Sequence, residues 1–148
     1  MDNITEYMMR QLQSVGFSYP DYEHHLNFGM VYGWRGSAYR IGGWEDGEFS
    51  ETDRQAAAEG LWLPDSSQLL SWMKGCGFTV SMQLDADGYY HVAATDSGNG
   101  THYSGGGPLL SHALHKTIYQ ICKSRGPYRP EPILRLEIQP AGDITTDI

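Results

Sequence analysis

A strict alternation of apolar and polar residues constrains the fold of this chain more than any other feature. Every even position from 78 to 84 carries a large apolar residue, and every odd position between them carries a polar one. This is the period of a half-buried β-strand. The segment that follows, Asp85-Ala86-Asp87-Gly88-Tyr89, fits a three-residue hairpin loop in which Gly88 adopts a left-handed backbone conformation.

The loop length also predicts the register of the hairpin. Residue 84 should face residue 90, residue 82 should face residue 92, and residue 80 should face residue 94. Tyr90, Val92 and Ala94 then join the apolar face. A loop one residue shorter or longer would place a less apolar set on that face. The residues of the turn and the hydrophobic pattern of the strands therefore predict the same hairpin register.

Helices are expected on both sides of this hairpin in the sequence. Asp65 and Gln68 have the spacing of a capping box, and Gly75 and Gly77 end the helix that follows. After the hairpin we expect a third strand over residues 101–104 and a glycine loop over 105–107. A helix should then begin near Pro108. Its apolar face comprises Leu109, Leu110, Ala113, Leu114, Thr117, Ile118 and Ile121, and its polar face comprises His112, His115, Lys116, Tyr119 and Lys123.

The first 60 residues predict a helix followed by a segment rich in glycine and aromatic residues. Residues 3–15 have helical spacing, with Asp2 or Asn3 as the cap. Two short strands, 28–34 and 38–42, are expected around the turn at residues 35–37. A short helix should follow Ser50 and close at Gly60.

These elements predict a single α+β domain spanning residues 1–148. It should contain an antiparallel sheet of three to five strands, with a core meander over about residues 78–104, flanked by helices. Residues 61–125 form the expected helix-meander-helix core. Residues 126–148 are expected to be a C-terminal extension with a possible edge strand over 133–138. A chain of 148 residues with 40 % hydrophobic residues suits one such domain.

Charge and hydropathy exclude several classes of partner. The net charge of −8 repels phosphate backbones, so nucleic-acid binding is not expected. No run approaches the roughly 18 apolar residues that a membrane span requires. The first residues lack the pattern of a signal peptide, which predicts a cytoplasmic protein with Cys76 and Cys122 reduced.

Residues 61–122 resemble the small phage and prophage proteins described as ABA-sandwich domains. The resemblance implies helices that cover a short antiparallel sheet and an origin in a mobile element, and it implies no catalytic residue. Trp34 and Trp44 are the counterparts of a Trp- and Gly-rich segment in that family, whereas the 133–138 segment departs from its short form. The matching residues are Leu63-Pro64-Asp65-Ser66, Leu69-Leu70, Trp72, Gly77-Phe78, Gly88-Tyr89-Tyr90, Tyr103 and Ser111-His112-Ala113-Leu114.

Two groups of residues are candidates for ligand binding. The glycine loop Ser104, Gly105, Gly106 and Gly107 precedes a helix, where exposed amides could hold an anion. It lacks the Gly-Lys-Ser/Thr ending of a P-loop, and an ordinary strand-to-helix turn is the alternative. Trp34 and Trp44 could line a partner groove, or they could simply cover one face of a sheet.

Four histidines raise the possibility of an enzyme. His91, His102, His112 and His115 could serve a metal-dependent enzyme or a small hydrolase. The helix histidines lack the nearby carboxylate of a His-Glu-x-x-His motif, and no nucleophile motif is present. We therefore expect no metal site, no cofactor and no catalytic residue.

The preferred hypothesis is a non-enzymatic interaction domain or small-ligand-binding domain. A small hydrolase or metal-dependent enzyme is one alternative, and a nucleotide-sequestering protein that uses the glycine loop is another. We also expect self-association as a two-fold dimer, because a short meander leaves two sheet edges with unpaired backbone groups.

Overall fold

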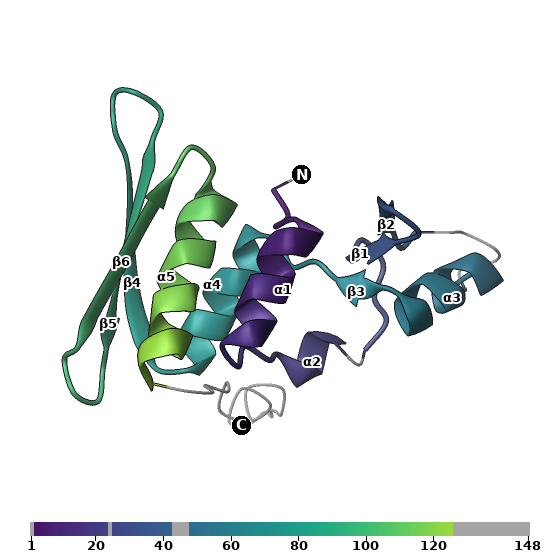
Figure 1. The fold of residues 1–148 in the computed structure, drawn as a ribbon, viewed down its shortest axis with the longest axis horizontal. Helices are drawn as coiled ribbons and strands as arrows, with labels where there is room; N and C mark the ends of the chain where they lie inside the picture. Colours follow the sequence, from purple (N-terminus) through teal and green to yellow (C-terminus); the bar gives the residue numbers. More distant parts are fainter. Residues whose placement is uncertain (1, 24, 43–47, 126–148) are drawn as a thin grey trace, which may run out of the picture.

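The computed structural model describes residues 2–23, 25–42 and 48–125, which form two three-stranded antiparallel sheets and the helices that pack on them. The predicted α+β class is confirmed. Figure 1 shows the sheets at opposite ends of the described chain, with α1, α4 and α5 between them. The elements in chain order are α1 (Glu6–Ser14), α2 (Pro20–Glu23), β1 (Val31–Trp34), β2 (Ser37–Arg40), α3 (Glu51–Glu59), β3 (Leu61–Trp62), α4 (Ser66–Gly75), β4 (Phe78–Leu84), β5 (Tyr90–Asp96), β6 (His102–Gly107) and α5 (Leu110–Arg125).

The larger sheet has the strand order β4-β5-β6, and its hairpin has the predicted register. Leu84 pairs with Tyr90, residue 82 with residue 92, and residue 80 with residue 94. Gly88 has a φ of +80°, as the loop chemistry requires. The amides of Asp87 and Tyr89 donate to Asp85 Oδ1 at 2.9 and 3.0 Å. One carboxylate therefore organises the loop.

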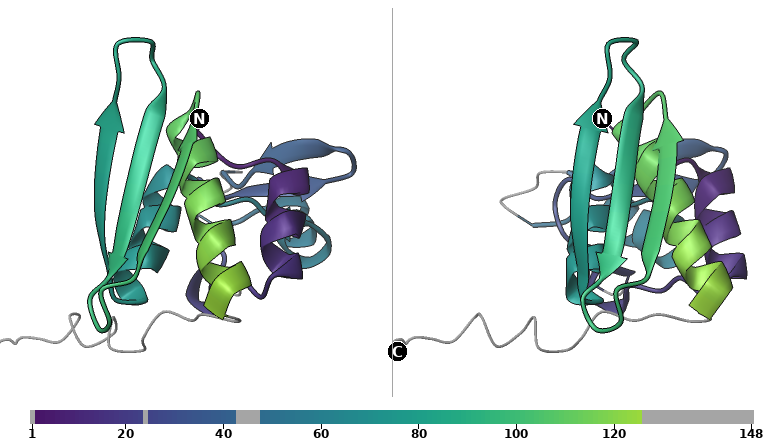
Figure 2. Two further views of the ribbon diagram at one scale, coloured as in Figure 1. Left: turned by 60° about the vertical axis from the view of Figure 1, so that its left-hand side comes forward. Right: turned by 90° about the vertical axis from the view of Figure 1, so that its left-hand side faces the viewer.

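The described helices cover one face of the larger sheet and leave the other open, as the face-on view in Figure 2 shows. α5 lies along β5 and β6, and α4 lies against β4. Val92 and Ala94 on the covered face are fully buried. This cover ends before the tip of the hairpin, because Met82 and Leu84 on the same face are 47 % and 59 % exposed.

The glycine run is the main departure from the predicted structure. Residues 105–107 were expected to form a loop, but β6 continues to Gly107, with Gly105 paired to Val92. A Cβ at Gly105 would lie 2.7 Å from Thr117 Oγ1, and one at Gly107 would lie 2.8 Å from the Cβ of His112. The glycines therefore allow α5 to lie directly on the backbone of β6.

α5 is buried on two sides, because it lies between the larger sheet and α1. Leu114 and Ile118 of its predicted apolar face are completely buried. The prediction that His115 lies on the polar face is wrong, since His115 is only 7 % exposed. Contact with α1 buries that side of the helix, which a prediction from one apolar stripe did not anticipate.

The smaller sheet has the strand order β2-β1-β3, with α3 packed beside it. Arg35 and Gly36 both have positive φ values, +52° and +82°, which is the geometry of a two-residue type I′ hairpin turn. β1 and β2 are shorter than predicted. β3 was not predicted, because it has only two residues and forms by pairing with β1.

The N-terminal segment joins the two sheets. α1 begins at Glu6 with Thr5 as its cap, later than the predicted start at residue 3. Asn3 instead forms an antiparallel bridge with Asp65. The amide of Ser111 donates to Asp2 Oδ2 at 3.1 Å. Asp2, which is distant in the sequence, thus accepts a hydrogen bond from an amide in the first turn of α5 that has no partner within the helix. Trp44 and the predicted 133–138 strand lie outside the described residues.

Candidate functional site

The predicted ligand residues do not form one site in the described structure. Ser104, Gly105, Gly106 and Gly107 lie on β6 of the larger sheet, and Trp34 lies on β1 of the smaller sheet. Trp44 is outside the described residues. A phosphate cradle requires several consecutive amides that point the same way, whereas successive amides of a strand point to opposite sides. The observed strand therefore removes the geometry on which the nucleotide hypothesis depended.

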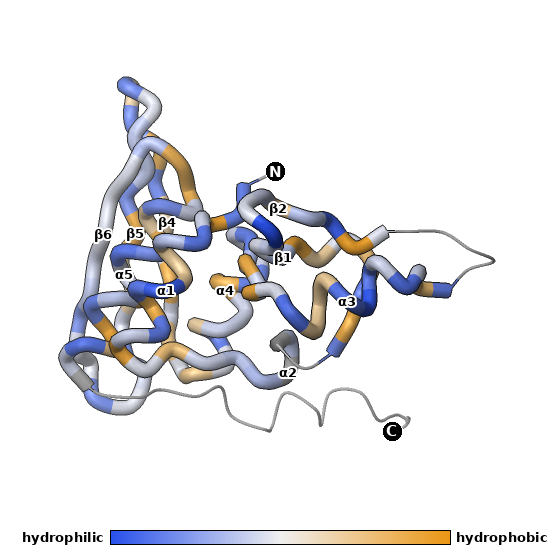
Figure 3. Tube along the Cα trace, turned by 45° about the vertical axis from the view of Figure 1, so that its right-hand side comes forward, coloured by the Kyte–Doolittle hydropathy of each residue, from blue (hydrophilic) through white to orange (hydrophobic). Residues whose placement is uncertain are grey.

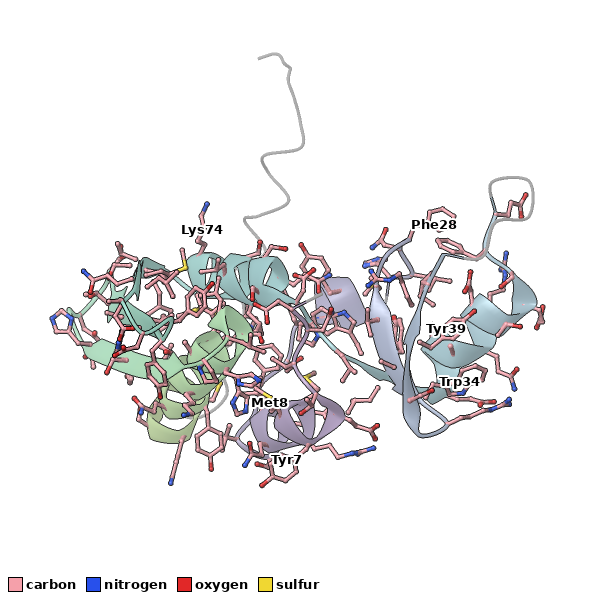
Figure 4. The ribbon with its side chains drawn as sticks, turned by 90° about the horizontal axis from the view of Figure 1, so that it is seen from above. Tyr7, Met8, Phe28, Trp34, Tyr39 and Lys74 are labelled. Atoms are coloured by element: carbon pink, nitrogen blue, oxygen red, sulfur yellow. The ribbon has the colours of Figure 1, made fainter. Side chains whose placement is uncertain are left out.

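Trp34 is engaged by its own neighbours. Its Nε1 donates to Glu59 Oε1 at 2.9 Å, and its ring packs edge-on against Tyr39 at 5.5 Å. The guanidinium of Arg35 lies 4.3 Å from the ring centroid. Figure 4 shows Trp34 and Tyr39 beside the smaller sheet and α3. The hydrogen bond from Trp34 lowers the pKa of Glu59. This arrangement agrees with the alternative in which the aromatic residues cover a sheet face.

Three of the four candidate histidines have different neighbours. His91 Nε2 lies 2.9 Å from Asp85 Oδ2, and His102 Nδ1 lies 2.9 Å from Thr95 Oγ1. Burial lowers the pKa of His115, which packs against the backbone at Met8. Among residues 2–23, 25–42 and 48–125, no three His, Cys, Asp or Glu side chains are grouped to hold a metal ion. Of the four histidines, the structure thus brings only His112 and His115, both on α5, close to each other.

The two cysteines are free thiols, and Cys122 belongs to the core. Burial raises the pKa of the Cys122 thiol to about 12. A thiol with such a pKa is protonated at neutral pH and is a poor nucleophile. Cys122 therefore acts as a small hydrophobic residue.

Two hydrogen bonds indicate which backbone groups of β4 face outward. The amide of Asp85 donates to the carbonyl of Tyr89 at 3.0 Å, and the amide of Ser97 donates to the carbonyl of Gly77 at 2.9 Å. Bonded and non-bonded pairs alternate along an antiparallel ladder, so odd-numbered residues of β4 bond to β5. Val80, Met82 and Leu84 therefore direct their N–H and C=O groups to the outer edge. No described residue pairs with that edge.

The opposite edge of the sheet, at β6, is protected. A groove of about 500 Å³ crosses the sheet from Ser81 and Gln83 of β4 to β6, where the exposed side chains of Lys116 and Gln120 from α5 line it together with Ser104 and Gly105. A lysine beside an edge strand discourages further strand pairing, because pairing would remove its charge from water. The glycines of β6 also make that strand weak.

The β4 edge has no such protection. None of its seven residues is charged, and it contains neither proline nor glycine. Three apolar side chains on its covered face, Val80, Met82 and Leu84, are at least partly exposed. In Figure 3 the loop beyond this strand, at the tip of the hairpin, includes strongly hydrophilic residues. A long, uncharged, partly apolar edge is a template for another strand.

The loop at the end of the hairpin carries the nearest negative charge. Hydrogen bonds from His91 and from the amides of Tyr89 and Asp87 lower the pKa of Asp85. Asp85 is therefore ionised at neutral pH, and Asp87 lies beside it in the same loop. Lys74, in the last turn of α4, stands out into solvent near the other end of β4 (Figure 4). The strand thus runs between a negative end and a positive end.

A second hollow lies between the N-terminal segment and the β1–β2 hairpin. It has a volume of about 480 Å³, within the usual range of roughly 300–1,000 Å³ for small-molecule sites. Ile4, Val31 and Leu63 form its apolar part, and Glu6 and Arg40 also line it. Glu6 already pairs with Arg10 at 2.8 Å, which leaves this hollow without a distinctive chemical signature.

Comparison with known proteins gives no relative from which a function could be transferred. No family model matches the chain, and neither the curated proteins nor the solved structures include a significant match. Within the described residues, no helix has both the length and the apolar character needed to cross a membrane.

The β4 edge was not singled out among the expected sheet edges, although the sequence carries a signal for it. The alternation over 78–84 predicted the strand and its apolar face correctly. The absence of any charge in these seven residues, in a chain with net charge −8, was the further signal. What could not be predicted is that the helices stop short of Met82 and Leu84, because that depends on how β6 and α5 pack.

Proposed function

We propose that this chain is a non-enzymatic interaction domain that binds an extended, uncharged protein segment along β4. The segment adds to the larger sheet as a further strand. One observation carries this proposal: the β4 edge is uncharged and exposes its backbone groups, whereas the β6 edge is flanked by Lys116.

Strand addition uses two features of this edge. Backbone groups of Val80, Met82 and Leu84 supply hydrogen bonds that hold any extended chain, and the alternating side chains select its sequence. Because Met82 and Leu84 are exposed on the helix side of the sheet, apolar residues of the partner are favoured there. Polar residues are favoured on the open side, beside Ser81 and Gln83.

A peptide with alternating valine and threonine tests the proposal. We expect it to shift the NMR amide signals of Val80, Met82 and Leu84 in dilute protein, where self-association is least. The same peptide with alternate amides methylated should bind at least about tenfold more weakly, since methylation removes the donors. Signal changes elsewhere, or none at β4, would show that β4 does not accept a strand.

Two lysine variants provide a matched pair for this experiment. Met82→Lys places a charge on the apolar side of the edge, and Gln83→Lys places the same charge on the open side. Both residues are exposed, so both variants should fold. We expect peptide binding to be lost in Met82→Lys and kept in Gln83→Lys. An equal change of peptide affinity in both variants would indicate a general effect of the added charge instead.

The setting of this function is also a proposal. Free thiols at Cys76 and Cys122 are compatible with a reducing compartment, and we place the protein in the cytoplasm. The resemblance of residues 61–122 to phage and prophage ABA-sandwich proteins supports an origin in a mobile element. Within the described residues no third His, Cys, Asp or Glu side chain joins His112 and His115 in a metal-binding group, so the hydrolase alternative has little support.

A further inference from the structure

We infer that the segment bound along β4 is β4 of a second copy of this chain, so that two larger sheets join across a two-fold axis next to Ser81. This inference rests on the proposed function, because it names the partner of the same edge. The result is a continuous six-stranded antiparallel sheet with helices on one face. Such closed two-fold pairing is the commonest way in which soluble proteins assemble.

The sequence of β4 is complementary to itself in this arrangement. With Ser81 opposite Ser81 of the partner subunit, Val80 lies opposite Met82 of the partner subunit. Thr79 then lies opposite Gln83 of the partner subunit. Apolar residues thus meet apolar residues on the helix side, and polar residues meet polar residues on the open side. The two strands overlap along their full length.

Backbone pairing agrees with the same register. The outward-facing N–H and C=O groups of β4 belong to even-numbered residues, including Val80 and Met82. In the two-fold arrangement these even-numbered residues oppose one another, so they form the hydrogen-bonded pairs of the new ladder. A shift by one residue would oppose even and odd residues and would also bring apolar side chains against polar ones.

The charges around β4 favour this contact over other contacts between two copies of the chain. The chain carries a net charge of −8, so most contacts between two copies would bring like charges together. The β4 contact contains no charge. Gly77 of one copy lies opposite Asp85 of the partner subunit, which brings the acidic loop of one copy toward the α4 end that carries Lys74 on the other. The two ends of β4 thus complement each other.

Light scattering of the full chain over a range of concentrations tests this inference. We expect a mass approaching twice 16.6 kDa as concentration rises. Met82→Lys should raise the concentration at half-dimerisation more than about tenfold, because its lysine would be buried without a partner charge. Gln83→Lys should leave it nearly unchanged. Circular dichroism of both variants establishes that they are folded.

Amide hydrogen exchange locates the contact. Protection of the Val80 and Met82 amides should increase with protein concentration, while the Thr79 and Ser81 amides, which bond to β5, should be protected at all concentrations.

The outcomes separate this inference from the proposed function. A chain that stays at one-chain mass but binds the valine-threonine peptide at β4 overturns the inference and leaves the proposed function standing. A dimer that persists in Met82→Lys also overturns it, since the contact then lies elsewhere. If the chain neither dimerises nor binds the peptide, both proposals fail.

Discussion

Individual residues in this protein owe their roles to burial. Leu114 is completely buried at the centre of α5, and Cys122 on the same helix has its pKa raised to about 12 by burial. Trp72 is equally buried and donates its indole N–H to the carbonyl of Ser18 at 3.0 Å. These side chains hold the helices together and offer no chemistry to a substrate.

Leu114→Ala should destabilise the fold by about 2–5 kcal/mol, because truncation removes buried methyl groups and leaves a cavity between α5 and its neighbours. Urea denaturation followed by circular dichroism measures the change. Leu109→Ala, at an exposed position of the same segment, is the control and should cost much less. A loss below about 0.5 kcal/mol for Leu114→Ala would contradict the assigned core.

At the scale of secondary-structure elements, glycines serve two different purposes. Gly88 supplies a left-handed backbone conformation in the hairpin loop. Gly105 instead supplies space, because it lies in a strand beneath α5. The Gly-Gly-Gly segment of β6 is therefore a site of close packing. The two roles of glycine lead to separate predictions.

Gly88→Val should destabilise the hairpin, since a β-branched residue at φ +80° is strained by roughly 1–2 kcal/mol. Gly42→Val is the matched control, because a Cβ there has nothing within 4 Å and its φ lies outside the left-handed region. Thermal unfolding of both variants measures the difference. Similar midpoints for the two would contradict the assigned turn.

Gly105→Ala should cost about 1–3 kcal/mol, because its methyl group would press on Thr117 Oγ1 and on the carbonyl of Ala113. The neighbouring variant Ser104→Ala lies on the open face of the sheet and should have little effect. Chemical denaturation compares them. Equal stabilities would mean that α5 does not rest on the β6 backbone.

At the scale of the whole molecule, the described residues form two small sheets joined by helices, and α1 and α5 are part of that junction. His115 lies in the α1–α5 contact, near the backbone at Met8 and the ring of Tyr119. His112 and Lys116 on the same helix are the cationic groups nearest to it. The protonation state of this one side chain therefore bears on the stability of the whole fold.

Stability should fall as the pH drops below about 6.5, the ordinary pKa of histidine. Burial lowers the pKa of His115 in the folded state, so below 6.5 the unfolded chain binds a proton that the folded chain resists. His115→Phe should flatten this part of the pH profile, while His102→Phe on an exposed strand should not. Denaturation at several pH values between 5 and 7 measures it. A profile unchanged by His115→Phe would contradict this origin of the acid sensitivity.

Structures that depend on residues close together in the chain could be predicted from the local sequence alone. The capping box of Asp65 and Gln68, the hairpin register and the left-handed Gly88 were all predicted, because a few neighbouring side chains and backbone groups fix each of them. The buried stripe of α5 followed in the same way from its period.

Other features depend on contacts between segments that are distant in the sequence, so they became evident only in the folded chain. Gly105 belongs to a strand because Val92 and Thr117 lie on either side of it, and His115 is buried because α1 packs there. The two residues of β3 form a strand only through β1. Whether Met82 and Leu84 are covered depends on where the helices end in space, and no local pattern encodes that. The apolar side chains beside the β4 edge, the candidate site, are exposed for this reason.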